Sequence, residues 1–137
     1  MKRSKLRQSS CPTCRALDIF GDKWTLLVVR DLMFKGKARF SEFLASEEGI
    51  ATNILTERLQ RLEACEIIAR RADPTNSRGS IFALTKKGRD LLPLMIEITM
   101  WGTKYNRDCE APAVLTRRYK TDRAALLRDL SASLKAA

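Results

Sequence analysis

The stretch that most constrains the fold consists of two helical patterns separated by one glycine. Residues 41–48 (SEFLASEE) and 51–65 (ATNILTERLQRLEAC) both repeat apolar side chains at helical spacing. Gly49 between them favours a tight turn, because glycine adopts backbone conformations that other residues avoid. The sequence therefore predicts a helix-turn-helix, the motif whose second helix enters the major groove of DNA.

Directly after this second helix, the apolar spacing changes from that of a helix to that of a strand. Residues 66–73 (EIIARRAD) and 80–84 (SIFAL) predict two strands, and Pro74 and Gly79 between them predict a turn. A basic hairpin at this position is typical of a wing, which reaches the DNA backbone or the minor groove. The predicted fold class is mainly α with a small β-hairpin, a winged helix-turn-helix.

Further helices are predicted on both sides of this unit. A short helix over 11–20 and a second over 23–34 precede it, and a long helix over 86–108 with a kink at Pro93 follows it. Apolar residues cover more than one face of the long helix, which therefore needs a second surface to bury against. The side chains expected to cap helix N-termini are Asp22, Ser41 and Thr85.

These patterns divide the chain into a basic N-terminal arm (1–10), a winged-helix domain for DNA binding and dimerisation (11–108), and a basic linker with a short C-terminal helix (109–137). A chain of 137 residues is long enough to form one domain with a hydrophobic core. No apolar run approaches the roughly 18 residues of a membrane span. No signal-peptide pattern follows the basic N-terminus either, so we expect a cytoplasmic protein with mostly reduced thiols.

The formal net charge of +10 favours a polyanionic partner such as double-stranded DNA. Basic residues add affinity that does not depend on sequence, although the charge could also serve solubility alone. The chain contains no histidine, no paired carboxylates in a plausible site and no phosphate-binding loop, so we expect neither an enzyme nor a cofactor. A nucleoid-type DNA binder without sequence preference or a sensor role stays an alternative to a specific regulator.

The predicted helix over residues 51–65 has one apolar and one polar face. Leu55, Leu59 and Leu62 share the first face, and the second carries side chains whose chemistry suits base edges. Base contacts are expected from Thr52, Asn53, Thr56, Glu57 and Gln60. Contacts of the wing and to the DNA backbone are expected from Arg58, Arg61, Arg71, Arg78 and Lys86. The alternative is a solvated face on which Glu57 pairs with Arg61, while Arg58 bridges to a neighbouring helix or to a phosphate.

Several motifs in order resemble the HxlR-type family of bacterial winged-helix regulators. They are the segments 11–43 (CPTCRALDIFGDKWTLLVVRDLMFKGKARFSEF) and 50–63 (IATNILTERLQRLE), followed by ALTKKGRDLLPLM and a later WG pair. The resemblance covers roughly residues 11–105. The wing, DPTNSRG, departs from the Pro-Pro-Arg wing common in that family and is similar to the Asp-and-Arg wing of the related MarR type.

This resemblance implies a homodimeric transcription regulator, more often a repressor than an activator, without enzymatic activity. In such proteins the first and last helices form the dimer, which agrees with a last helix that is apolar on more than one face. The side chains expected at the dimer interface are Leu17, Phe20, Leu92, Ile96 and Met100.

The CPTC motif of Cys11 and Cys14 permits four interpretations. A thioredoxin-type enzyme needs the motif between a strand and a helix of an α/β fold, a pattern that this chain lacks. A zinc site would need Cys65 and Cys109 to converge on it without any histidine, and we expect no metal. A switch that responds to oxidants or electrophiles is favoured at Cys11, because the helix N-terminus and Arg15 stabilise a thiolate. The fourth interpretation is a structural thiol at a dimer interface.

The resemblance adds weight to the switch, since some members of that family sense oxidants or electrophiles with a cysteine at the start of the first helix. Cys11 occupies the matching position. Cys14 is expected to be buried in the helix and slower to react.

Overall fold

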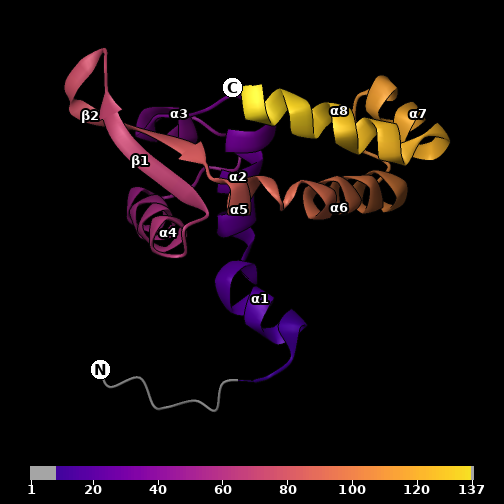
Figure 1. Cartoon of the computed structure of the whole chain (residues 1–137), viewed down its shortest axis with the longest axis horizontal. Coiled ribbons are helices and arrows are strands. Elements are labelled where there is room, and N and C mark those ends of the chain that lie inside the picture. The colour runs from indigo at the N-terminus through magenta and orange to yellow at the C-terminus, as the bar shows by residue number, and fades with distance from the viewer. Residues whose placement is uncertain (1–8, 137) are drawn as a thin grey trace.

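The computed structural model describes residues 9–136, and Figure 1 shows the arrangement of their helices and strands. The hairpin and α4 lie at one end of the molecule, α6, α7 and α8 lie at the other, and α2 and α5 lie between them. In chain order the elements are α1 (Pro12–Phe20), α2 (Lys23–Phe34), α3 (Phe40–Leu44), α4 (Thr52–Ala64), β1 (Ile68–Asp73), β2 (Asn76–Leu84), α5 (Lys86–Arg89), α6 (Leu92–Tyr105), α7 (Ala113–Thr121) and α8 (Arg123–Ala136).

The helix-turn-helix of α3 and α4 packs on α2 through one apolar core. Val29 and Leu55 are completely buried and Phe43 nearly so, which brings one side chain from each of the three helices into contact with the same core. Gly49 has a φ of 71° in the turn before α4, a conformation that glycine adopts without steric cost. The predicted helix-turn-helix and wing are confirmed.

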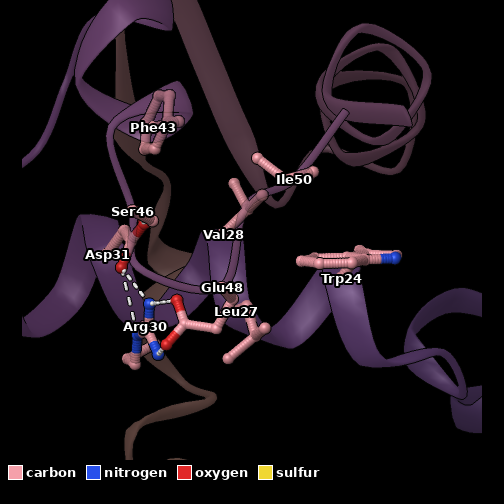
Figure 2. Close-up of a pocket in the computed structure, with 9 residues that line it drawn as sticks. All are labelled: Trp24, Leu27, Val28, Arg30, Asp31, Phe43, Ser46, Glu48 and Ile50. Carbon is pink, nitrogen blue, oxygen red and sulfur yellow. Dashed lines mark hydrogen bonds and ion pairs between the residues drawn. The ribbon is translucent and has the colours of Figure 1, made fainter. Parts of the chain in front are cut away.

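Polar side chains hold the turn between α3 and α4 onto α2 (Figure 2). Asp31 is only 3% exposed, and its carboxylate accepts hydrogen bonds from Arg30 (2.7 Å) and from the Ser46 hydroxyl (2.5 Å). Arg30 also pairs with Glu48 at 2.8 Å and lowers the pKa of that carboxyl to about 2. A buried carboxylate is tolerated only with such partners, so this cluster fixes the position of the turn.

Two of the three expected caps are present. The Asp22 carboxylate accepts hydrogen bonds from the backbone N–H groups of Trp24 and Thr25, and the Thr85 hydroxyl accepts one from Gly88 N–H. Ser41 is not a cap, because α3 begins at Phe40 and its N-cap residue is Arg39.

The wing is an antiparallel hairpin in which Ile68 pairs with Leu84 and Ala72 with Ser80. The register then shifts, and Asp73 pairs with Asn76. Arg78 falls within the predicted turn, but it lies within β2, in the irregular part between Asn76 and Ser80. The turn itself is shorter than predicted, because Asp73 closes it with its own side chain.

The predicted helix over 86–108 consists of two helices, α5 and α6. Pro93 lies in the first turn of α6, where a missing N–H costs nothing, so it starts a helix instead of bending one. The predicted basic linker after Pro112 is also wrong, because residues 113–121 form α7. Leu126 of α8 is 3% exposed, so the C-terminal helices are part of the packed structure.

The α6 side chains that were predicted to form the dimer interface lie in the core of the chain instead. Leu92, Ile96 and Met100 are buried in the core of their own chain and present no surface to a partner. The large apolar side chains that α6 exposes are Leu94, Ile98, Trp101 and Tyr105. A helix that is apolar on all sides does not indicate from sequence which face its own chain covers.

The first helix, α1, projects from the body of the molecule (Figure 1). None of its residues is buried: Leu17 is exposed and Phe20 is half-buried. Cys14, expected inside the helix, is exposed as well. No helix within residues 9–136 is long and apolar enough to cross a membrane.

Candidate nucleic-acid interface

The polar face predicted on α4 is exposed along the whole helix. Its apolar face is anchored in the core by Leu55, Leu59 and Leu62, all at most 4% exposed. The exposed side chains are those proposed for base contacts, Thr52, Asn53, Thr56, Glu57 and Gln60. The arrangement agrees with a recognition helix whose N-terminal half faces outward.

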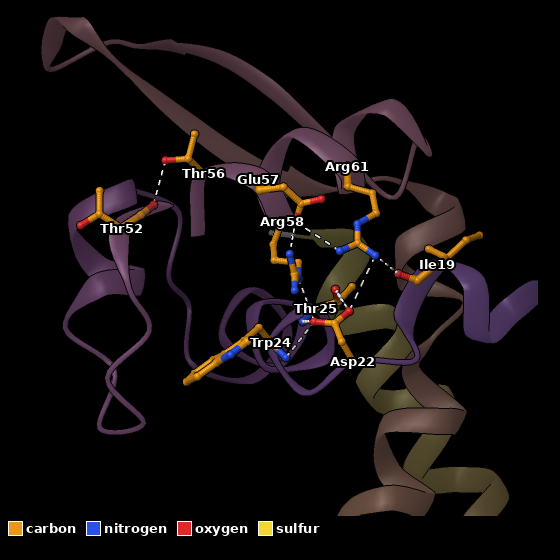
Figure 3. Close-up of polar contacts among 9 residues, drawn as sticks. All are labelled: Ile19, Asp22, Trp24, Thr25, Thr52, Thr56, Glu57, Arg58 and Arg61. Atoms are coloured by element: carbon orange, nitrogen blue, oxygen red, sulfur yellow. Dashed lines mark hydrogen bonds and ion pairs between the residues drawn. The ribbon is translucent and has the colours of Figure 1, made fainter. Parts of the chain in front are cut away.

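Asp22 connects this helix to the junction between α1 and α2 (Figure 3). In addition to capping α2, its carboxylate accepts a hydrogen bond from Arg58 Nε at 2.8 Å and lies 3.8 Å from Arg61 Nη1. Arg61 also donates to the backbone carbonyl of Ile19, the penultimate residue of α1. These contacts hold the recognition helix against the first two helices of the chain.

The pKa of Asp22 reflects this position. Partial burial raises the pKa, but hydrogen bonds from Thr25 and Arg58 outweigh it and lower the pKa from 3.8 to about 2. The carboxylate is therefore ionised throughout the neutral range and stays available to Arg58.

Two arginines proposed for DNA backbone contacts are thus already engaged within the chain. Arg58 pairs with Asp22 and Glu57, and Arg61 pairs with Glu57 at 3.2 Å. The alternative interpretation, in which Arg58 bridges to a neighbouring helix and Glu57 pairs with Arg61, describes their contacts correctly. We assign both arginines to positioning α4.

The basic side chains of the wing remain exposed. Arg71 lies on β1, Arg78 lies on β2, and Lys86 begins α5, where it forms an exposed ion pair with Asp90 at 3.3 Å. Exposed pairs of this kind contribute little to stability, so Lys86 can exchange its partner for a phosphate. All three predicted wing positions are therefore accessible.

The turn of the wing depends on an ion pair that the sequence did not reveal. Arg39, which precedes α3, donates to the buried carboxylate of Asp73 at 2.7 Å, and Asp73 also accepts from the N–H (2.9 Å) and hydroxyl of Thr75. These bonds lower the pKa of Asp73, the Arg39 bond having the largest effect. The Asp-Pro-Thr sequence indicated the turn itself. It did not indicate the ion pair, because Arg39 lies 34 residues before Asp73 in the chain.

Replacing Asp22 with alanine is expected to lower the free energy of unfolding by about 1–3 kcal/mol, because α2 loses its cap and Arg58 loses its carboxylate. The folded-state pKa lies below the ordinary value, so this stabilisation is present above about pH 4 and is lost as the pH falls toward 2. Urea denaturation at pH 7 and at pH 3 measures both effects. The control is Asp90→Ala, which removes only the exposed pair with Lys86 and should change little at either pH. Equal effects of the two substitutions would contradict the role given to Asp22.

Cys11 lies at the N-terminus of α1, as predicted, with Pro12 as the first helical residue. The backbone N–H groups of Cys14 and Thr13 at the start of α1 favour the thiolate and lower the pKa of Cys11 below its ordinary value. All four cysteines are free thiols. Among residues 9–136, no cluster of three or more metal-ligating side chains exists.

Comparison with known proteins decides what this arrangement represents. The model of the HxlR-like helix-turn-helix family matches residues 19–110, which include every element of the helix-turn-helix and the wing. The chain belongs to the HxlR family. Its members are transcription regulators that bind DNA, and they are not enzymes.

Individual proteins similar to this chain agree with this membership. The HTH-type transcriptional regulator sll1512 of Synechocystis sp. is 34% identical over 102 residues, which are 73% of this chain and 75% of that protein. The solved structure of PA1607 is 40% identical, with a TM-score of 0.67 over 80% of this chain and 73% of the other. The oxidised form of the redox regulator HypR is 32% identical, with a TM-score of 0.63 over 70% of this chain and 98% of the other.

Proposed function

We propose that this HxlR-type regulator recognises a specific DNA sequence through α4 and the adjacent wing. The observation that carries this proposal is the exposed, chemically varied face of α4 on a helix that Arg58 and Arg61 hold in place. A non-specific binder needs only positive charge, whereas this face offers two amides, two hydroxyls and a carboxylate. The basic arm adds affinity for any DNA, although most of it lies outside the described residues.

We further propose that the active form is a homodimer. Exposed Leu17 on α1 and exposed Leu94 and Ile98 on α6 supply apolar surface that an isolated chain leaves in water. Two copies related by a twofold axis would present two α4 helices to the same face of the duplex.

A dimer of this kind is expected to select an inverted repeat from a library of random DNA, with half-site centres about 10 bp apart or a multiple of that. Sequencing the retained fragments measures the spacing. Ile98→Glu, which places a charge on the proposed interface, should yield a monomer in light scattering and lose the paired half-sites. A wild-type protein that enriches no motif would support the non-specific alternative.

We propose that Cys11 is the residue through which oxidants or electrophiles change DNA binding. Its exposed thiol lies at the positive end of α1, and the pKa of the thiol is lowered there, which favours the reactive thiolate. The opposite end of α1 accepts a hydrogen bond from Arg61 of the recognition helix. A displacement of α1 can therefore change the position of α4, and the spacing of two such helices must match the half-sites. The redox regulator HypR has the same fold, which supports this reading by analogy.

Cys11→Ser is expected to abolish the loss of operator binding that a mild oxidant causes in the wild type. Cys14→Ser is the matched control, because Cys14 is also exposed on α1 but lies one turn further along. It should leave the response nearly unchanged. Gel-shift titrations with and without diamide give the comparison. An oxidant response that persists in Cys11→Ser would assign the sensor to another thiol.

A further inference from the structure

The turn of the wing lies beyond the part of the hairpin that the two strands hold in register. Regular pairing of β1 with β2 ends at Ala72 and Ser80, and the register shifts before Asp73. Figure 1 shows this end of the hairpin extending past α3 and α4. Arg78, which we expect to contact DNA, lies in the irregular part of β2. Its position therefore depends on the contacts that fix the turn.

Within residues 69–78, no apolar side chain is buried, and Asp73 is the one buried residue. Its carboxylate is withdrawn from water only because it has hydrogen-bond partners. The bonds that it accepts from Thr75 are local to the turn. The bonds from Arg39 are therefore the contacts through which this carboxylate joins the turn to the rest of the chain.

Arg39 binds the carboxylate of Asp73 through two nitrogen atoms. Its Nε donates to Oδ2 at 2.7 Å, and its Nη2 donates to Oδ1 at 3.3 Å. The same Nη2 lies 3.4 Å from the hydroxyl oxygen of Thr75. A planar guanidinium that pairs through two atoms restricts direction as well as distance. The pair therefore fixes the orientation of the turn.

Arg39 is itself fixed to the helix-turn-helix. It is the N-cap residue of α3, and its backbone N–H donates to the Glu42 carboxylate at 2.8 Å. The backbone on either side pairs with β2: the Ala38 carbonyl accepts from Phe82 N–H at 2.8 Å, and Arg39 forms a β-bridge with Ile81. The Arg39 side chain thus connects the turn of the wing to the helix that precedes α4.

We propose that Arg39 is a positioning residue for DNA recognition, because its ion pair with Asp73 fixes the wing relative to α4. The inference rests on the proposed recognition of DNA by α4 and the wing. With the pair intact, the bases that α4 reads and the flanking DNA that the wing contacts lie at one fixed spacing. Without it, the paired strands persist, but the turn and Arg78 sample several positions. Asp73 opens the segment DPTNSRG, in which this wing departs from the Pro-Pro-Arg wing common in the family, so family membership alone does not imply the pair.

The double variant Arg39→Gln/Asp73→Asn tests the proposal without leaving a buried carboxylate unpaired. The new amide at position 73 can still accept the bond from Thr75 N–H, so the local turn is kept. Hydroxyl-radical footprinting on the operator selected by the wild type measures protection of the DNA backbone. At saturating protein, the variant should protect the backbone beside the bases that α4 contacts as the wild type does, and protect the flanking backbone at least about threefold less. Arg39→Lys should fall between the two, because an ammonium pairs with the carboxylate as a single point charge.

Glu63→Gln is the matched control, because the pair of Glu63 with Arg70 also joins the wing to the helix-turn-helix. That pair is longer, at 3.7 Å, and both of its side chains are exposed. Its loss should leave both regions of the footprint unchanged.

Unchanged flanking protection in the double variant would overturn the proposal while leaving recognition by α4 intact. An equal loss of protection in both regions would overturn it as well, because that pattern indicates a general loss of structure. A loss of flanking protection in Glu63→Gln as large as in the double variant would remove the special role of Arg39. Failure of the proposed function looks different, because the wild type itself would then select no operator, and Arg39 would have no recognition to position.

Discussion

Gly88→Ala is expected to lower the free energy of unfolding by about 1–3 kcal/mol, although it adds a single methyl group. A Cβ atom at this position would lie 2.2 Å from the carbonyl oxygen of Ile67 and 3.0 Å from Leu84 Cδ2. The Ile67 carbonyl cannot move freely, because it accepts hydrogen bonds from the N–H and the hydroxyl of Thr85. The substitution therefore forces the start of α5 away from the base of the wing.

Gly102→Ala provides the matched comparison, because no heavy atom lies within 4 Å of the Cβ that it would add on α6. Alanine has the higher helix propensity, so this variant should be as stable as the wild type or more stable by up to about 1 kcal/mol. Urea denaturation of both variants measures the difference. Equal stability of the two would contradict the close contact of Gly88 with Ile67 and with Leu84 of β2.

The helix-turn-helix could be predicted because its signals are local. Leu55, Leu59 and Leu62 repeat at helical spacing, and Gly49 marks the turn, so both faces of α4 follow from one short segment. The same logic fails for α6, where Leu92 and Leu94 are equally apolar although only Leu92 is buried in the core. Choosing between them requires knowing how α2 and α8 pack on α6.

The ion pairs that hold α4 and the wing in place could not be predicted, because they join distant parts of the chain. Asp22 was expected to cap α2, but its bond to Arg58 spans 36 residues and depends on how α2 and α4 pack. The pair of Arg39 and Asp73 is likewise visible only in three dimensions. Charged residues on a helix leave several partners open in sequence, and tertiary packing selects among them.

Asn53→Ala and Thr56→Ala are each expected to weaken operator binding by about 1–3 kcal/mol while changing affinity for random DNA little. Both side chains are exposed on the N-terminal half of α4. The Asn53 amide can bind an adenine edge with two hydrogen bonds. The Thr56 hydroxyl donates to the Thr52 carbonyl at 2.9 Å, which leaves its oxygen lone pair and methyl group for a base.

Thr121→Ala is the matched control for Thr56→Ala. The Thr121 hydroxyl makes the same kind of contact, to the Arg117 carbonyl at 2.9 Å, and Thr121 is likewise exposed, on α7 at the other end of the molecule. Each substitution therefore removes one intrahelical hydrogen bond of the same kind, and the two sites differ in where they lie on the molecule. Any difference in DNA binding between them comes from position.

The most direct test of sequence recognition by α4 is the ratio of operator affinity to random-DNA affinity, measured at one fixed salt concentration for the wild type, Thr56→Ala and Thr121→Ala. Salt is held constant because phosphate contacts make every DNA affinity depend on it. We expect Thr56→Ala to lower this ratio by at least about fivefold and Thr121→Ala to leave it unchanged. Equal ratios for all three proteins, or a loss in Thr56→Ala that is the same on random DNA, would contradict recognition by this face.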